Sequence, residues 1–95
     1  MSEEQTIGIV EPVTEETTDV KLPFKVILYN DEWHTFDEVI VQLIKAVKCT
    51  FEQARAFAFE VHTRGLATVF TGELNKCLKV SSILEEIELH TQVVS

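Results

Sequence analysis

The sequence predicts a compact, single-domain α+β fold, in which a three-stranded antiparallel sheet packs on one side against three helices. The predicted order is strand, helix, helix, strand, helix, strand. Three observations lead to this class: a buried apolar run, FKVILY; two segments of helical apolar spacing that each begin with a capping box; and a C-terminal IELHTQV that alternates between two faces. A chain of 95 residues has room for one core.

The first 22 residues differ in composition from the rest, and we predict a disordered acidic arm at 1–22 followed by a folded domain at 23–95. Residues 1–20 hold six of the sixteen acidic residues and none of the eight basic ones, and no regular period runs through them. The rest of the chain holds ten acidic residues and all eight basic ones, and the basic residues form no patch. Neither nucleic acid nor an anionic membrane is therefore an expected partner. The sequence shows neither a run of roughly 20 apolar residues nor a basic secretion signal, so we expect a cytoplasmic location.

The first strand and the first helix follow from local signals. The strand FKVILY is bounded by Pro23 and Asn30. Thr35 and Glu38 then form a T-x-x-E capping box, in which each side chain satisfies a backbone N–H at the start of a helix that runs to about Lys48. The apolar positions of this helix are Phe36, Val39, Ile40, Leu43, Ile44 and Val47.

A second helix begins after a hinge of one or two residues. Thr50 and Gln53 form its capping box, and Gly65 supplies a left-handed stop. Its apolar side is predicted to hold Phe51, Ala54, Phe57, Ala58 and Val61.

The C-terminal part is predicted to be strand, helix, strand. LATVF forms a short strand, Thr71 and Gly72 turn the chain, and a third helix runs from Glu73 to about Leu84 with Leu74, Cys77, Leu78 and Ile83 toward the core. In the final strand Ile87, Leu89, Thr91 and Val93 share the buried face.

The cysteines and histidines do not predict a metal site. Cys49 and Cys77 lie in apolar helical patterns and are expected to be reduced, buried thiols. The three histidines form no HxxxH or HExxH spacing, and no CxxC is present, so no metal and no cofactor are predicted.

Asn30, Asp31 and His62 are the candidate polar groups of a binding site. They offer a carboxylate, an amide and an imidazole, which together suit a protonated α-amino group with its three N–H donors. Phe36 and Val39 of the first helix are spaced to face Ala58 and Val61 of the second, so these four side chains are expected to wall an apolar hole below that rim.

Three stretches give the chain a resemblance to a known family. LYNDEWHTFDEVI, a helix that ends in EVHTRG, and ATVFTGE resemble ClpS, the adaptor that hands N-degron substrates to a Clp protease. The resemblance spans Phe24 to about Val94, and a weaker one extends to the ClpS-like domains of ubiquitin ligases that read N-degrons.

The resemblance implies roles for individual residues. Asn30 and Asp31 would hold the α-amino group and first peptide unit of a substrate, and His62 would be a further partner of that amine. Val39 and Val61 match apolar pocket walls. The family's usual threonine and proline are here His34 and Thr35, and its methionine gatekeeper and a second pocket methionine are here Phe36 and Ala58. Either His34 solvates the loop or it belongs to the pocket, and Trp33 either packs on a substrate or partner or covers the sheet edge.

The resemblance also implies partners. Glu73 and Lys79 are candidates for docking the N-terminal domain of a ClpA or ClpC unfoldase, and the arm would enter that unfoldase during delivery. We therefore expect a monomeric, non-enzymatic adaptor with no catalytic residue.

Two other classes stay open. An enzyme would use Asp31 with His62, or a cysteine with His62, but no oxyanion-hole motif accompanies them. A scaffold or ribosomal-stalk-like interaction domain of similar topology would need no such rim at all.

Overall fold

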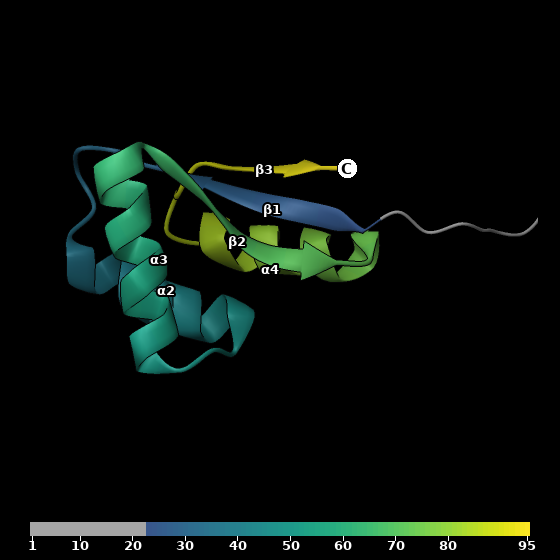
Figure 1. Ribbon diagram of the computed structural model, residues 1–95, viewed down its shortest axis with the longest axis horizontal. Helices are drawn as coiled ribbons and strands as arrows, with labels where there is room; N and C mark the ends of the chain where they lie inside the picture. Colours follow the sequence, from purple (N-terminus) through teal and green to yellow (C-terminus); the bar gives the residue numbers. More distant parts are fainter. Residues whose placement is uncertain (1–22) are drawn as a thin grey trace, which may run out of the picture.

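The computed structural model describes residues 23–95, so the predicted arm at 1–22 lies outside the described residues (Figure 1). The elements follow the predicted order, and the predicted fold class is confirmed. They are β1 (Phe24–Tyr29), α2 (Phe36–Val47), α3 (Phe51–Arg64), β2 (Leu66–Gly72), α4 (Leu74–Glu85) and β3 (Thr91–Val94).

β1 is the central strand of the sheet, which has the order β2-β1-β3 with both pairings antiparallel. Val26 and Leu28 are fully buried and point to the helical side, whereas Lys25 before them is exposed and Ile27 between them is half-buried. Alternation along a strand sends neighbouring side chains to opposite faces, so only one face of β1 builds the core.

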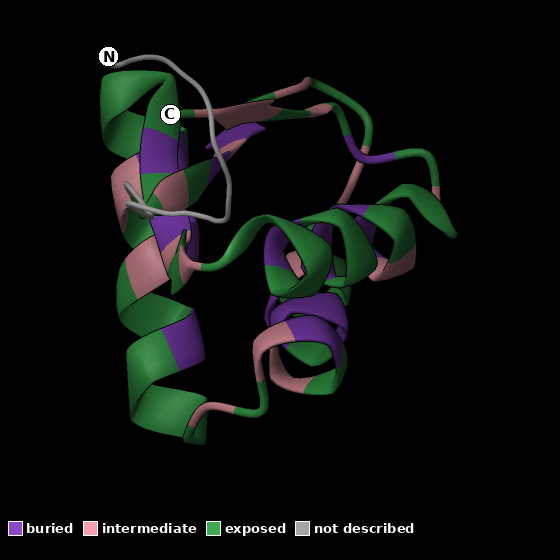
Figure 2. Ribbon diagram, turned by 90° about the vertical axis from the view of Figure 1, so that its right-hand side faces the viewer, coloured by how far each residue is buried: buried purple, intermediate pink, exposed green. Residues whose placement is uncertain are grey.

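The helices lie on that side of the sheet, with α4 along the strands and α2 and α3 toward one end (Figure 1). α4 contacts all three strands, α3 packs on β2, and α2 packs against α3 and α4. Figure 2 shows that the buried positions gather where the helices face each other and the sheet. Leu28, Leu43, Leu84 and Cys77 are among the most deeply buried side chains.

Both predicted capping boxes are present. The Thr35 hydroxyl accepts from the Glu38 amide at 3.1 Å, and the Thr35 amide donates to the Glu38 carboxylate at 2.8 Å. The same reciprocal pair starts α3, and Gly65 ends it with φ 90°, the left-handed conformation that glycine adopts at low cost. α2 ends at Lys48, which is also left-handed with φ 63°.

The expected turn at Thr71 and Gly72 is wrong. Both residues belong to β2 and pair with the first two residues of β1, Lys25 with Thr71 and Phe24 with Gly72. The strand is longer than LATVF because its partner β1 begins at Phe24, and antiparallel pairing extends as far as both strands reach.

The predicted core face of the third helix is also wrong in part. Leu74 is 41% and Leu78 is 50% exposed, whereas Cys77, Val80, Ser81 and Leu84 are the buried positions. These lie at i, i+3, i+4 and i+7, the spacing of one helical face, and the two leucines flank it. On α3, Phe51 likewise is not buried, with 54% of its surface exposed.

The final strand is shorter than predicted, at Thr91–Val94. Glu88 has φ 66°, and its amide donates to the Glu85 carbonyl at 2.9 Å, so the backbone turns where the strand was expected. The predicted alternation in burial persists nevertheless, with Leu89 buried between exposed Glu88 and His90.

Both cysteines are free. Cys77 is buried in α4 as predicted, whereas Cys49 is only half-buried and lies in the link between α2 and α3. From residue 23 to the C-terminus, no helix is long and apolar enough to cross a membrane.

Candidate functional site

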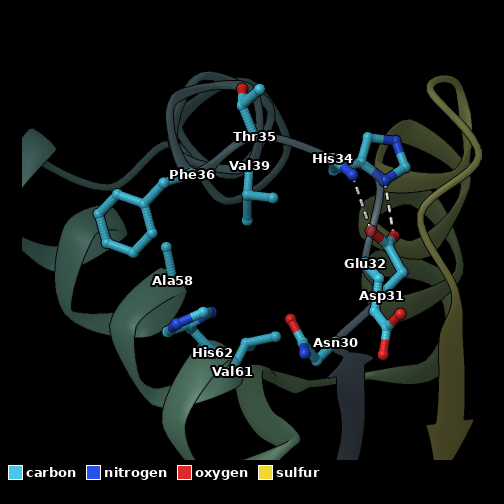
Figure 3. Close-up of a pocket in the computed structure, with 10 residues that line it drawn as sticks. All are labelled: Asn30, Asp31, Glu32, His34, Thr35, Phe36, Val39, Ala58, Val61 and His62. Atoms are coloured by element: carbon cyan, nitrogen blue, oxygen red, sulfur yellow. Dashed lines mark hydrogen bonds and ion pairs between the residues drawn. The ribbon is translucent and has the colours of Figure 1, made fainter.

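A cavity of about 690 Å³ lies between the loop after β1, the first turn of α2 and the last turns of α3 (Figure 3). Its volume is in the range of ligand pockets. All eight residues that the sequence proposes for substrate binding line it, and Glu32 and Thr35 are lining residues that sequence reasoning missed. The ten are Asn30, Asp31, Glu32, His34, Thr35, Phe36, Val39, Ala58, Val61 and His62.

A backbone hydrogen bond brings the two sequence-distant parts of the site together. The Asn30 amide donates to the carbonyl of Gly65 at 2.9 Å. Because Gly65 is the residue that ends α3, this bond holds the end of β1 against the helix turn that carries Val61 and His62.

The polar wall is formed by Asn30, Asp31 and His62. Figure 3 shows the side-chain amide of Asn30 pointing into the cavity, with His62 on the α3 side and Asp31 on the opposite, loop side. The structure therefore brings the three predicted polar groups to one cavity.

Asp31 is more heavily engaged than the sequence indicates. Its Oδ1 accepts from the amides of Trp33 at 3.1 Å and His34 at 2.9 Å, and its Oδ2 contacts His34 Nδ1 at 2.6 Å. A carboxylate has about four acceptor positions, so about one remains for a ligand. Burial alone would raise the pKa of Asp31, but the hydrogen bonds from His34 and Trp33 outweigh it, and the pKa is lowered. Asp31 is thus an anion at neutral pH.

His34 is buried in the wall, with 4% of its side chain exposed, and so does not merely solvate the loop. Its second ring nitrogen, Nε2, contacts the carbonyl oxygen of Ile87 at 2.5 Å. Burial would lower the pKa of His34, but the hydrogen bonds with Asp31 and Ile87 and the charges of Asp31 and Glu38 raise it. Ile87 lies 53 residues away in the sequence, and no local pattern indicates this contact.

Trp33 is 62% exposed and stacks on His34, with ring centroids 4.0 Å apart and planes tilted by 32°. It does not line the cavity. Within the described residues, its ring packs on the site's own histidine.

The apolar wall comes from α2 and α3. Phe36 and Ala58 lie next to each other at one side of the cavity, and Val39 and Val61 complete the apolar surface (Figure 3). Phe36 keeps 38% of its surface exposed, whereas Ala58 and Val61 are 3% and 4% exposed. A smaller hollow of about 20 Å³ shares part of this lining and adds Leu28, Tyr29 and Leu89. It has space for about one water molecule.

The two residues proposed for docking an unfoldase lie outside the cavity wall. Glu73 is the N-cap of α4 and makes no side-chain capping bond, and Lys79 lies in the middle of the same helix. Both are exposed, as are Leu74 and Leu78 on the same helix. Among residues 23–95, no group of three or more His, Cys, Asp and Glu side chains is placed to hold a metal ion.

Comparisons with known proteins agree with this fold. The family model described as "ATP-dependent Clp protease adaptor protein ClpS" matches residues 20–92. The chain therefore belongs to the ClpS family, a family of adaptors.

Two relatives are ubiquitin ligases. Human E3 ubiquitin-protein ligase UBR2 is 40% identical over 57 residues, which cover 60% of this chain and 3% of the ligase. Drosophila melanogaster E3 ubiquitin-protein ligase UBR1 is 39% identical over 70 residues, 73% of this chain and 4% of the ligase. The chain thus corresponds to a small part of each of these relatives.

A solved structure shows the same fold. Agrobacterium tumefaciens ClpS2 bound to L-phenylalaninamide superposes with a TM-score of 0.70 at 19% identity, covering 75% of this chain and 93% of that one.

Proposed function

We propose that this protein binds proteins whose first residue is bulky and hydrophobic (Leu, Phe, Tyr or Trp) and delivers them to a Clp AAA+ unfoldase-protease. The observation that carries the proposal is the composition of one cavity. Asn30, Asp31 and His62 line the same cavity as the apolar side chains of Val39 and Val61.

The chemistry of a protein N-terminus matches both halves of that cavity. An α-ammonium group presents three N–H donors and one positive charge, and it gains from the carboxylate of Asp31 and from acceptors on Asn30 and His62. The side chain of the first residue enters the apolar half, where burial of a Leu or Phe contributes about 1.5–3 kcal/mol. Hydrogen bonds to a charged group add about 1.5–3 kcal/mol each before association costs are subtracted. A micromolar or somewhat tighter affinity results, which suits an adaptor that must release its cargo.

The ligand of the similar structure supports this reading. L-phenylalaninamide, bound to Agrobacterium tumefaciens ClpS2, combines a free α-amino group with an aromatic side chain. It therefore has the two features for which the cavity of this chain provides partners.

Delivery requires a second surface. We place the docking of a ClpA or ClpC N-terminal domain at Glu73 and Lys79, whose exposure on α4 leaves both charges free to meet a partner. The monomeric state, the cytoplasmic location and the role of the arm at 1–22 stay predictions from the sequence.

Peptide binding tests the recognition step. Fluorescence anisotropy is measured with peptides that carry a C-terminal dye and differ only in the first residue: Phe, Asp and N-acetyl-Phe. We expect binding of the Phe peptide alone, its loss in Asn30→Ala, and no change in Asn75→Ala, a matched control on the exposed face of α4. Equal binding of all three peptides, or an unaffected Asn30→Ala variant, would instead favour the interaction-domain alternative.

A further inference from the structure

Two contacts of the His34 ring indicate how many protons the ring carries. Nδ1 lies 2.6 Å from a carboxylate oxygen of Asp31, and Nε2 lies 2.5 Å from the carbonyl oxygen of Ile87. Both oxygens are acceptors, so each contact needs an N–H on the imidazole side. A neutral imidazole carries one N–H, whereas an imidazolium carries two.

The surroundings agree with the charged form. The Asp31 carboxylate supplies the countercharge for a cation that is otherwise shielded from water. The indole ring of Trp33 stacks over the imidazole at 4.0 Å, a position in which an aromatic face attracts a cation. The raised pKa of His34 also favours the imidazolium.

We propose that His34 is a positioning residue that, as an imidazolium, clamps the amine-binding loop to the turn between α4 and β3. The clamp joins Asp31 to the Ile87 carbonyl through one ring, and it sets the direction in which Asp31 presents its remaining acceptor position. Loss of one proton removes one of the two bonds, and it leaves a nitrogen lone pair facing an oxygen. The loop then loses its tie to the turn or its tie to Asp31.

Other ionisable groups surround the clamp on each neighbouring element. Glu38 of α2 is close enough for its charge to favour the imidazolium. Glu86 and Glu88 flank Ile87 on the α4–β3 side, and Glu86 is paired with Lys45 at 2.8 Å. Glu32 of the loop and His62 of α3 share the cavity wall.

The clamp has two opposing effects on a bound amine. The imidazolium orders Asp31, but its charge also repels an ammonium group nearby. We infer that ordering is the larger effect, because Asp31 screens the imidazolium and the backbone amides already hold Oδ1 in place. This part rests on the proposed function, whereas the protonation of His34 does not.

The protonation is tested in the ligand-free protein. Long-range ¹H–¹⁵N NMR spectra of the three histidine rings are recorded from acid to alkaline pH. We expect His34 to keep both ring protons to a higher pH than N-acetyl-histidine amide in the same buffer, which serves as the reference compound. A His34 ring that has lost one proton at the pH where this compound is half titrated would overturn the clamp.

The positioning role is tested by binding. The affinity for a Phe-initiated peptide is measured across the same pH range for the natural protein, His34→Asn and His34→Gln. Titration of the peptide amine cancels in the ratio of affinities to each variant. We expect the natural protein to bind about tenfold more tightly below the His34 midpoint, as for one hydrogen bond to a charged group, and the ratio to fall above it.

The outcomes separate the two ideas. An affinity ratio that stays constant across the His34 midpoint, or that increases above it, would overturn the positioning role. A constant ratio would mean that the protonation of His34 does not affect peptide binding, and an increase would mean that repulsion of the amine is the larger effect. Should no variant and no natural protein bind the peptide, the proposed function fails while the NMR result still decides the clamp. If both substitutions unfold the chain, the natural protein alone decides the role. The pH midpoint of its peptide affinity is compared with the NMR midpoint of His34. Equal midpoints support the positioning role, and different midpoints overturn it.

Discussion

Replacing Phe36 by alanine should weaken binding of a bulky first residue with little effect on the fold. Phe36 begins α2 and lies beside Ala58 in the cavity (Figure 3), but 38% of its surface is exposed in the free protein. The exposed part is the part that a ligand can cover. The substitution therefore separates a contact made with the ligand from contacts made within the core.

The magnitude follows from that exposed fraction. A phenylalanine has roughly 200 Å² to bury, so 38% of it is about 75 Å². At about 25 cal/mol per Å², full coverage by a ligand is worth about 2 kcal/mol, or roughly thirtyfold in affinity. Since a ligand covers only part of this area, we expect a loss of about five- to thirtyfold.

The assay is fluorescence anisotropy with a Phe-initiated peptide, and thermal unfolding checks the fold of each variant. Phe59→Ala is the matched control, because Phe59 is 61% exposed on α3 and does not line the cavity. Equal affinities for Phe36→Ala, Phe59→Ala and the natural protein would show that the first side chain does not bind beside Phe36, and the apolar half of the site would have to be reassigned.

Two further predictions concern the same cavity. Ala58→Met fills cavity space beside Phe36, so the affinity for Trp- and Phe-initiated peptides should fall more than that for a Leu-initiated one. An equal change for all three peptides in anisotropy titrations would contradict the assignment of Ala58 to the apolar side of the site. The Asp31–His34 pair should stabilise the fold most between the ordinary pKa values of the two groups, about 3.9 and 6.5. Because folding lowers the pKa of Asp31, the stability that Asp31 contributes is lost as the pH falls through its pKa in the folded protein. Because folding raises the pKa of His34, the stability that His34 contributes is lost as the pH rises through its pKa in the folded protein. Urea unfolding of the natural protein and His34→Asn across pH measures both limits, and a pH-independent difference between them would refute the pairing.

Local sequence signals determined most of the secondary structure. Thr35 and Thr50 with their partners three residues on mark both helix starts, because a capping box is a contact within one turn of chain. Gly65 marks the end of α3 for a similarly local reason, the ease with which glycine adopts a positive φ. The eight candidate binding residues came from such signals combined with a family resemblance, and all eight line one cavity.

Errors in the elements arose where a partner far away in the chain decides. The length of β2 depends on pairing with β1, and the buried face of α4 depends on which of its sides meets the sheet. Gln42 of α2 depends on a distant partner in the same way: its polar side chain is buried, and it donates to the Ile83 carbonyl at 2.7 Å.

The sequence by itself determined the order of the elements, their caps and the chemical types at the candidate site, since each of these follows from neighbours within a few residues. Only the tertiary structure decided how that chemistry is arranged. The bond from the Asn30 backbone amide to the Gly65 carbonyl brings Asn30 to the same cavity as His62, and the contact from His34 to Ile87 ties the loop that carries Asp31 to the turn before β3. Both are contacts between segments far apart in the chain, whose distance and direction arise only when the core has packed.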